Sequence, residues 1–315
     1  MSEFDLIKRY FTRPTPSAIL GVGDDAALLR IADGMEFAVS TDMLVSGTHF
    51  LPNADPFLLG HKTLAVNLSD LAAMGAVPRW ATLALSLPAG DEKWLQRFSA
   101  GFFALADEHG VELIGGDTTR GPLNLCVTIM GEVPKGKALR RSGAHAGDDI
   151  WVSGILGMAA LGLAFLRGKT ELPEEDRLFC LAALHKPLPQ VALGLALRDI
   201  AHSAIDISDG LLADLGHILE CSQLGAEIQF DAIPKVTEGS IDEALLQHCV
   251  LSGGDDYELC FTAAEASRAE IEAIAQKLQL PLTRIGLIRT EQGCTVRAAD
   301  GGELKPKESG YDHFK

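Results

Sequence analysis

The sequence predicts an α/β (α+β) protein of two domains. Apolar segments of strand length alternate with longer segments of helical periodicity along its 315 residues, a length that exceeds one typical domain. Apolar residues make up 47% of the chain and aromatic residues only 6%, which favours aliphatic layers of helices on sheets. The turn-rich segment 140–148 is the best place for a boundary, so we expect domains of residues 1–138 and 139–315.

The first domain opens with an amphipathic helix that has Phe4, Ile7 and Phe11 roughly in line. Asp55 and Pro56 mark the start of a long apolar helix. The periodicity predicts strands at 27–31, 36–41, 79–87, 111–115 and 123–133, and helices at 55–76 and 91–109.

The second domain repeats the alternation of strand and helix. Its patterns predict strands at 149–153, 204–208, 226–230, 257–262, 282–288 and 294–298. Ala- and Leu-rich helices are expected up to about residue 200, followed by helices at 209–223, 240–248 and 264–278. Each domain is therefore expected to have its own core.

The bulk composition excludes several classes of function. A formal net charge of −16 argues against binding to nucleic acid, which needs Lys and Arg to neutralise phosphates. No apolar run reaches the ~18 residues of a membrane span, and the N-terminus is not that of a signal peptide, so we expect a cytoplasmic protein that contacts no membrane. The six cysteines show no C-x-x-C spacing and stand in apolar surroundings, which indicates reduced core residues.

Six acidic motifs share one pattern, in which Asp stands beside Gly, Ser or Asn near the end of an apolar segment. Glycines let the backbone approach a ligand closely, and carboxylate and hydroxyl oxygens are the ligands that Mg²⁺ prefers. We therefore expect a cation site assembled from loops at one sheet edge. The motifs occupy residues 21–26, 40–42, 67–70, 114–119, 205–210 and 252–258.

Each motif alone also has an ordinary structural interpretation. Gly21 to Asp25 is a possible surface turn, Asp42 a possible helix cap, and Asp70 a possible solvated residue on a surface helix. Ser208 and the amides after it precede a predicted helix, where they would either meet phosphate or simply cap the helix.

Other nucleotide and catalytic motifs are missing. Residues 168–170 (Gly-Lys-Thr) mimic the end of a P-loop, but Leu163 stands where its first glycine is required. No G-x-G-x-x-G opens a βαβ unit, and neither H-E-x-x-H nor G-x-S-x-G occurs. Among the histidines, His49 is the one best placed to touch a substrate, whereas His61 on a helix is more typical of a structural or solvated residue.

Taken in order, the motifs resemble those of the bacterial thiamine-monophosphate kinases, a family of the aminoimidazole ribonucleotide synthetase-like superfamily. The resemblance runs from Phe4 to Phe314 through GVGDDAALL, STDMLVSGTHF, VNLSDLAAMGA, LIGGDTTRGP, RRSGAHAGD, AIDISDGL, SGGDDYELCF and GYDHF. It implies two α/β domains and a homodimer in which the N-terminal domains pair into a β-barrel. It also implies transfer of phosphate from ATP to thiamine phosphate with several Mg²⁺ ions, the last step in making thiamine diphosphate.

The resemblance also implies roles for single residues. The magnesium ligands would be Asp25, Ser40, Thr41, Asp42, Asp70, Asp117, Asp206 and Asp209, of which Asp42, Asp117 and Asp209 are the expected catalytic residues. ATP would meet Gly116, Asp117, Arg141 and Ser208, and thiamine phosphate would meet His49, Asp255 and Tyr311. Asp255 departs from the Glu that the family usually has, and its side chain is one methylene shorter.

Related functions fit the sequence less well. Selenophosphate synthetases usually carry Cys or selenocysteine near the first glycine-rich motif, but the first cysteine here is Cys126. The hydrogenase-maturation relatives end in a reactive cysteine, whereas this chain ends in YDHFK. A non-catalytic nucleotide or metal sensor on the same scaffold is the alternative from another class, and the full set of Asp motifs counts against it.

Overall fold

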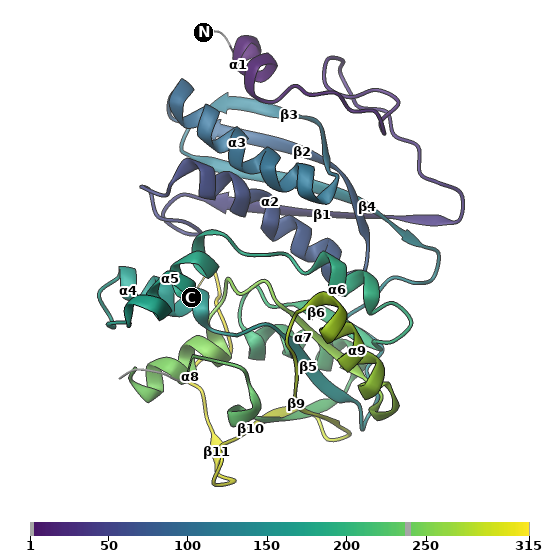
Figure 1. Ribbon diagram of the computed structural model, residues 1–315, viewed down its shortest axis with the longest axis vertical. Coiled ribbons are helices and arrows are strands. Elements are labelled where there is room, and N and C mark those ends of the chain that lie inside the picture. Colours follow the sequence, from purple (N-terminus) through teal and green to yellow (C-terminus); the bar gives the residue numbers. More distant parts are fainter. Residues whose placement is uncertain (1–2, 237–240, 315) are drawn as a thin grey trace. The chain divides into compact units, whose positions relative to one another are not determined.

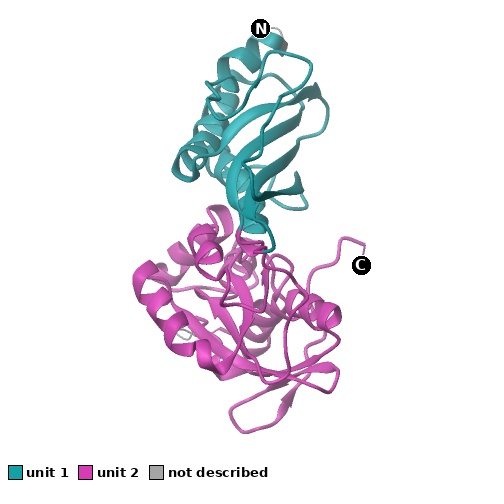
Figure 2. Ribbon diagram, turned by 90° about the vertical axis from the view of Figure 1, so that its right-hand side faces the viewer, with its two compact units in different colours: residues 1–71, 76–136 teal, residues 72–75, 137–315 magenta. Residues whose placement is uncertain are grey.

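The computed structural model describes residues 3–236 and 241–314 (Figure 1). The chain divides into two compact units, which Figure 2 colours separately. The first consists of residues 1–71 and 76–136, and the second of residues 72–75 and 137–315. Each unit has its own sheet, as the alternation of strands and helices predicts. In the part of the chain that is described, no helix combines the length and apolar character needed to cross a bilayer.

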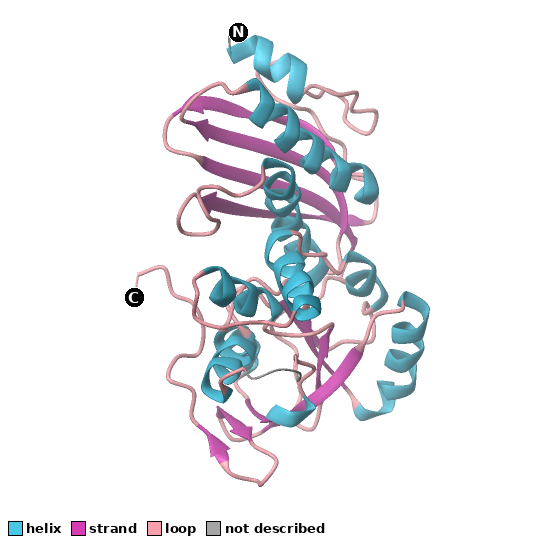
Figure 3. Ribbon diagram, turned by 60° about the vertical axis from the view of Figure 1, so that its left-hand side comes forward, coloured by secondary structure: helices cyan, strands magenta, loops and turns pink. Residues whose placement is uncertain are grey.

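The first unit is a four-stranded sheet in the order β1-β4-β2-β3. Only the β2–β3 pair is parallel. The strands are β1 (Met35–Val45), β2 (Val77–Leu87), β3 (Glu112–Arg120) and β4 (Asn124–Pro134), and the helices are α1 (Glu3–Tyr10), α2 (Pro56–Ala73) and α3 (Glu92–His109). In Figures 1 and 3 the helices α2 and α3 cover one face of this sheet.

Both long helices begin at aspartate caps. The Asp55 carboxylate accepts the N–H groups of Phe57 and Leu58 at 2.9 and 3.2 Å, as expected for a cap before a proline at the first helical position. Asp91 accepts N–H groups in the same way at the start of α3. These caps use backbone donors that would otherwise lack partners, so helix starts are fixed locally by the sequence.

The sheet of the first unit has one face that helices do not cover. Ala81, Leu83 and Leu85 point into the core below α2 and α3, whereas Phe37, Val39 and Met43 alternate on the other face and are 40%, 54% and 52% exposed. That alternation is the register of a half-covered sheet, but its outer side chains are large and apolar.

The strand predicted at 27–31 is wrong. Only an isolated bridge between Leu20 and Leu28 occurs there. Ala27 and Leu29 instead pack on the buried cluster of Trp80, Ile114 and Met130. The alternating pattern of this segment therefore reflects packing onto the open face of the sheet and not membership of a sheet.

The second unit contains a seven-stranded mixed sheet in the order β11-β10-β7-β9-β5-β8-β6. Its strands are β5 (Asp149–Ser153), β6 (Ser203–Asp206), β7 (Gly225–Gln229), β8 (Leu259–Ala263), β9 (Leu282–Arg289), β10 (Gly293–Arg297) and β11 (Glu303–Leu304). Its helices are α4 (Met158–Leu166), α5 (Glu174–His185), α6 (Val191–Ala196), α7 (Leu211–Ser222), α8 (Glu243–Ser252) and α9 (Arg268–Leu278). The helix predicted at 240–248 is present as α8, and residue 240 lies outside the described residues.

Two sequence interpretations of side-chain burial need correction. Phe4 is 78% exposed, whereas Leu6 in α1 and Phe11 directly after that helix are buried. Cys221 and Cys294 are exposed, whereas Cys180, Cys249 and Cys260 are buried as predicted. Burial raises the pKa of Cys180 to about 11 and that of Cys249 to about 12, which keeps these core thiols protonated.

Candidate functional site

Ser40, Asp42 and Asp70 come together where β1 meets α2. The Ser40 hydroxyl donates to the Asp70 carboxylate, and the Asp42 N–H donates to Asn67 Oδ1 at 3.1 Å. Asn67 is buried, and its amide also donates to the Thr63 carbonyl inside α2. The predicted shared face of Asn67 and Asp70 is confirmed, because both side chains contact β1. The half-buried Asp42 and Asp70 are thus both held at the junction of β1 and α2, Asp70 through Ser40 and Asp42 through Asn67.

The neighbours of this junction differ in how they are placed. His49 Nδ1 accepts the Val45 N–H at 3.0 Å, so the proton of a neutral His49 ring sits on Nε2. The Thr41 hydroxyl pairs with that of Thr128 at 2.8 Å on the opposite face of the sheet from Ser40 and Asp42. Asp25 is exposed in the loop before β1.

Gly116 and Asp117 lie on β3, at the other edge of the same sheet from Asp42 on β1. The register places Asp42, Val127, Leu83 and Gly116 in one row across the four strands. Three strand spacings of about 4.8 Å separate the ends of that row by about 14 Å. Asp117 pairs with exposed Ala84, in the neighbouring row that faces away from α2.

These positions correct the expectation that all acidic motifs gather at one sheet edge. Asp42 and Asp117 are inside long strands, because β1 and β3 continue past the predicted ends. The two residues belong to opposite edges and faces of the sheet.

Gly116 cannot be replaced by a residue with a side chain. Its φ is +149°, and a Cβ there would come within 1.9 Å of the Leu83 carbonyl oxygen.

In the second unit three loops converge. The Asp255 N–H donates to the Ser208 carbonyl at 2.9 Å, and the Tyr311 N–H donates to the Asp209 carbonyl at 3.0 Å. A Cβ on Gly254 would lie 2.4 Å from the Ser208 oxygen, so only glycine lets these backbones approach. The structure thereby brings together four predicted site residues that are far apart in the sequence.

Asp214 organises the loop before α7. One carboxylate oxygen of this buried residue accepts the N–H groups of Ser208, Asp209 and Gly210, each at 3.0 Å. The backbone amides that we expected to be available for phosphate are therefore already used. Burial raises the pKa of Asp214 to about 7, and these three hydrogen bonds oppose the rise.

The pKa of Asp209 depends on burial and on several charged neighbours. Burial raises the pKa of this half-buried carboxyl, and nearby Asp255 adds to the rise. The neighbouring His313, His217 and Arg141 lower the pKa of Asp209 and so act in the opposite direction. Buried Asp206, at the end of β6, lies three residues before Asp209. An additional cation here would relieve the mutual repulsion of the carboxylates.

Asp255 and Tyr257 both have left-handed backbone conformations, with φ of 71° and 51°. The Tyr257 hydroxyl donates to Asp255 Oδ1 at 3.0 Å, which fixes the direction of the Asp255 side chain. Asp tolerates left-handed geometry better than most residues, so the departure from the family's Glu suits the local backbone.

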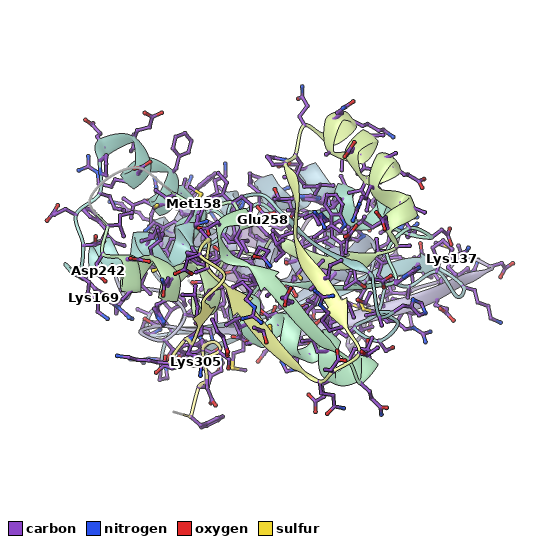
Figure 4. All side chains as sticks on the ribbon, turned by 90° about the horizontal axis from the view of Figure 1, so that it is seen from below. Lys137, Met158, Lys169, Asp242, Glu258 and Lys305 are labelled. Atoms are coloured by element: carbon purple, nitrogen blue, oxygen red, sulfur yellow. The ribbon has the colours of Figure 1, made fainter. Side chains whose placement is uncertain are left out.

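Two further acids of the same loop support the scaffold. The Asp256 carboxylate accepts the Gly157 N–H at 2.9 Å, at the start of α4, and burial raises its pKa well above the usual value. Glu258 accepts the Ser153 hydroxyl, and burial raises its pKa to about 7. In Figure 4 Glu258 lies toward the middle of the view, whereas Lys169 and Asp242 lie at its margin.

Comparisons with known proteins show the family of this chain. Residues 23–133 match the AIR synthase related protein, N-terminal domain, and residues 145–299 match the corresponding C-terminal domain. A thiamine-monophosphate kinase of Salmonella typhimurium is 48% identical over 318 residues, which cover 99% of this chain and 98% of that protein. The chain belongs to the thiamine-monophosphate kinase family.

Solved structures of the family share the fold. The crystal structure of thiamine-monophosphate kinase from Stenotrophomonas maltophilia K279a has a TM-score of 0.87 at 50% identity, covering 96% of this chain and 98% of that one. AaThiL complexed with AMPPCP and TMP has a TM-score of 0.78 at 28% identity, covering 90% and 89%.

The residues present suit a hard divalent cation. The first unit offers carboxylate and hydroxyl oxygens from Ser40, Asp42 and Asp70, and the second offers carboxylates from Asp206 and Asp209. Mg²⁺ takes oxygen ligands and usually retains water and substrate phosphates, so one or two carboxylates per ion are sufficient.

Sequence reasoning missed Asp214, Asp256 and Glu258 as the supports of the site. Asp214 offers one signal, since a carboxylate on an apolar helix four residues after Gly210 is expensive to bury without donors. Its partners are backbone groups, which have no signature in the sequence.

Proposed function

We propose that this protein is an ATP-dependent thiamine-phosphate kinase that makes thiamine diphosphate. The observation that carries the proposal is the set of oxygen ligands at Ser40, Asp42 and Asp70 and at Asp206 and Asp209, in a chain 48% identical to a thiamine-monophosphate kinase. The AMPPCP and TMP bound to AaThiL support a nucleotide and a phosphate monoester as the two substrates.

The proposed roles are assigned to each domain by itself. Residues 1–138 would supply metal and ATP binding and the dimer contact, and residues 139–315 form the C-terminal α/β domain with its own candidate ligands. We assign magnesium to Asp25, Ser40, Thr41, Asp42, Asp70, Asp117, Asp206 and Asp209, with Thr41 acting through its carbonyl because its hydroxyl faces away. ATP is assigned to Gly116, Asp117, Arg141 and Ser208, and thiamine phosphate to His49, Asp255 and Tyr311.

The acceptor determines what the protein's residues must do. A phosphate monoester is already largely anionic at neutral pH, so no strong general base is required. Bound Mg²⁺ would neutralise the phosphates, which is the main contribution to phosphoryl transfer besides positioning. Asp42, Asp117 and Asp209 are the proposed catalytic residues, each as a carboxylate that would hold Mg²⁺. Asp42 and Asp117 lie at opposite edges of the sheet, so they would serve different ions. Arg141 adds a fixed positive charge near Asp209, and the transfer is in line and direct, with no phosphoenzyme.

The proposed homodimer would use the open face of the first unit's sheet. Its outward side chains Phe37, Val39 and Met43 are large, apolar and half exposed. A β-barrel formed from two such sheets would bury them and remove the unpaired edge of β1. We also assign the enzyme to the cytoplasm, where ATP is available.

A panel of acceptors tests this proposal. We expect ADP formation with thiamine phosphate and none with thiamine itself, because the acceptor must supply a phosphate oxygen. A phosphorylated acceptor outside the thiamine series that is turned over faster would overturn the substrate assignment. A trapped phosphoenzyme labelled from γ-³²P-ATP would overturn direct transfer and leave the substrate assignment standing.

A further inference from the structure

His145, Asp148 and His202 form a cluster in the second unit that the kinase chemistry does not use. His145 and Asp148 belong to the loop that precedes β5, and His202 directly precedes β6. His202 Nδ1 lies 2.9 and 3.0 Å from the Asp148 oxygens and 3.0 Å from His145 Nδ1. Three ligand atoms from three side chains thus converge on one point.

The side-chain hydrogen bonds of this cluster depend on where one proton sits. A neutral imidazole carries one proton, so the facing Nδ1 atoms of His145 and His202 bond only if one of them is protonated. A proton on His202 Nδ1 would be shared among both Asp148 oxygens and His145 Nδ1. That proton therefore lies among three acceptor atoms, of which Asp148 Oδ2 also accepts the His145 N–H, and a divalent cation could be coordinated by all three.

The spacing also suits a transition ion. Zinc bound tetrahedrally at about 2.0–2.1 Å keeps its ligand atoms about 3.3 Å apart. The pairs here are 3.0 Å between the two Nδ1 atoms, 2.9 Å between His202 and Asp148, and 3.8 Å between His145 and Asp148. Sub-ångström movements would regularise this triangle.

Neighbouring groups already hold one of the three side chains in place. The Asp148 side chain is only 5% exposed, and its Oδ2 accepts the His145 N–H at 2.8 Å, which fixes the carboxylate. The side chain of His202 is 35% exposed and that of His145 is 69% exposed, so the fourth position is open to water. Imidazole nitrogens favour zinc-like ions over Mg²⁺.

We propose that His145, Asp148 and His202 bind a divalent transition ion of the zinc class, separate from the magnesium ligands. The ion would join the loop of residues 140–148 to the start of β6. That loop carries Arg141, and its Arg140 carbonyl already accepts the Ala204 N–H at 2.9 Å. Filling the site therefore cross-links the segment that presents Arg141.

Cobalt titration of the full-length protein in excess Mg²⁺ tests the proposal. Co²⁺ in a four-coordinate nitrogen and oxygen site absorbs strongly in the visible range, whereas Co²⁺ in a six-coordinate oxygen site of the magnesium type absorbs only weakly. We expect one Co²⁺ per chain in the wild type, displaced by Zn²⁺. His145→Ala and His202→Ala should weaken the affinity at least about tenfold, since even second-sphere changes cost that much.

Matched variants keep the result interpretable. His145 is mostly exposed, so its replacement leaves the fold intact, and His248→Ala removes another exposed histidine of the same unit as a control. Absence of cobalt absorption in the wild type would overturn the site. Equal affinity in the wild type and both histidine variants would do so too. Loss of the signal only in Cys221→Ser, with a sulfur-to-cobalt charge-transfer band, would assign the ion to an exposed thiol instead.

Discussion

Two pairs of acids, Asp42 with Asp70 in the first unit and Asp214 with Asp256 in the second, are held in different ways. Asp42 and Asp70 are half-buried, and the bonds that place them come from β1 and α2 through Asn67 and Ser40. Asp214 and Asp256 instead accept backbone N–H groups at the starts of α7 and α4. Asp residues in similar sequence motifs can therefore be either candidate metal ligands or acceptors for backbone N–H groups. The hydrogen-bond partners of the carboxylate oxygens distinguish the two roles.

The supporting acids of the second unit differ from ordinary carboxyl groups in their pKa values. Burial raises the pKa of Asp214 and Glu258 to about 7, so these acids lose little by being neutral. A residue that holds a cation must keep its charge, whereas a supporting acid needs only its acceptor oxygens. Replacement by an amide should separate the two kinds of acid.

The largest effect should come from Asp42→Asn. If Asp42 balances the charge of a metal, removing that charge should lower kcat at least about 100-fold, as removal of one transition-state contact commonly does. Steady-state ADP formation at saturating Mg²⁺ measures this, with thermal unfolding as the check that the fold is intact. Asp117→Asn should behave alike, and near-normal turnover in either variant would refute the role assigned to that residue.

Substitution of Asp214 should lower the stability of the fold, whereas substitution of Asp42 should lower only kcat. Asp214→Leu leaves three N–H groups without an acceptor, and each buried orphan costs about 1–3 kcal/mol, so we expect a loss of at least about 3 kcal/mol in the free energy of unfolding. Asp214→Asn keeps an acceptor oxygen and should recover most of that stability. Chemical denaturation of both variants checks this, and equal destabilisation would show that the charge matters and not the acceptor.

Glu258 should make stability depend on pH. Its folded pKa of about 7 is above the ordinary value of about 4.3, so its contribution is fully present below about pH 4 and is lost as pH rises through about 7. Glu258→Gln should remove this loss, worth on the order of 1–3 kcal/mol between pH 5 and pH 8. Denaturant unfolding at the two pH values measures this change in stability. The matched control is Glu270→Gln, at an exposed position on α9. A variant that keeps the wild-type pH slope would contradict the prediction.

Asp255→Glu should have the smallest effect. It restores the residue that is usual in the family. The backbone there has a φ of 71°, a conformation that Asp adopts more readily than Glu. We expect turnover within about twofold of wild type, equivalent to about 0.5 kcal/mol, with an unchanged or lower KM for thiamine phosphate. A large loss of activity would show that the pocket is built around the shorter side chain.

Most elements could be predicted from the sequence because their signals are local. The Asp55 cap and the apolar periodicity after it specify α2, and alternation specifies β2 and β4. The prediction failed at 27–31, where Ala27 and Leu29 alternate because they pack on Trp80 without pairing. It also ended β3 too early, because glycines such as Gly116 lack the side chains that mark a strand.

For the candidate site, the sequence by itself determined which chemistry is available. Repeated Asp beside Gly or Ser indicated oxygen ligands for Mg²⁺ and anionic substrates, since these residue types carry that chemistry in any fold. Only the tertiary structure decided which of these acids lie together. It placed Asp42 and Asp70 at the same junction of β1 and α2, and it separated Asp42 from Asp117 by two strands. The backbone N–H groups after Ile207 donate to the Asp214 carboxylate. Strand order and backbone hydrogen bonding result from contacts distant in the chain, and no local pattern encodes them.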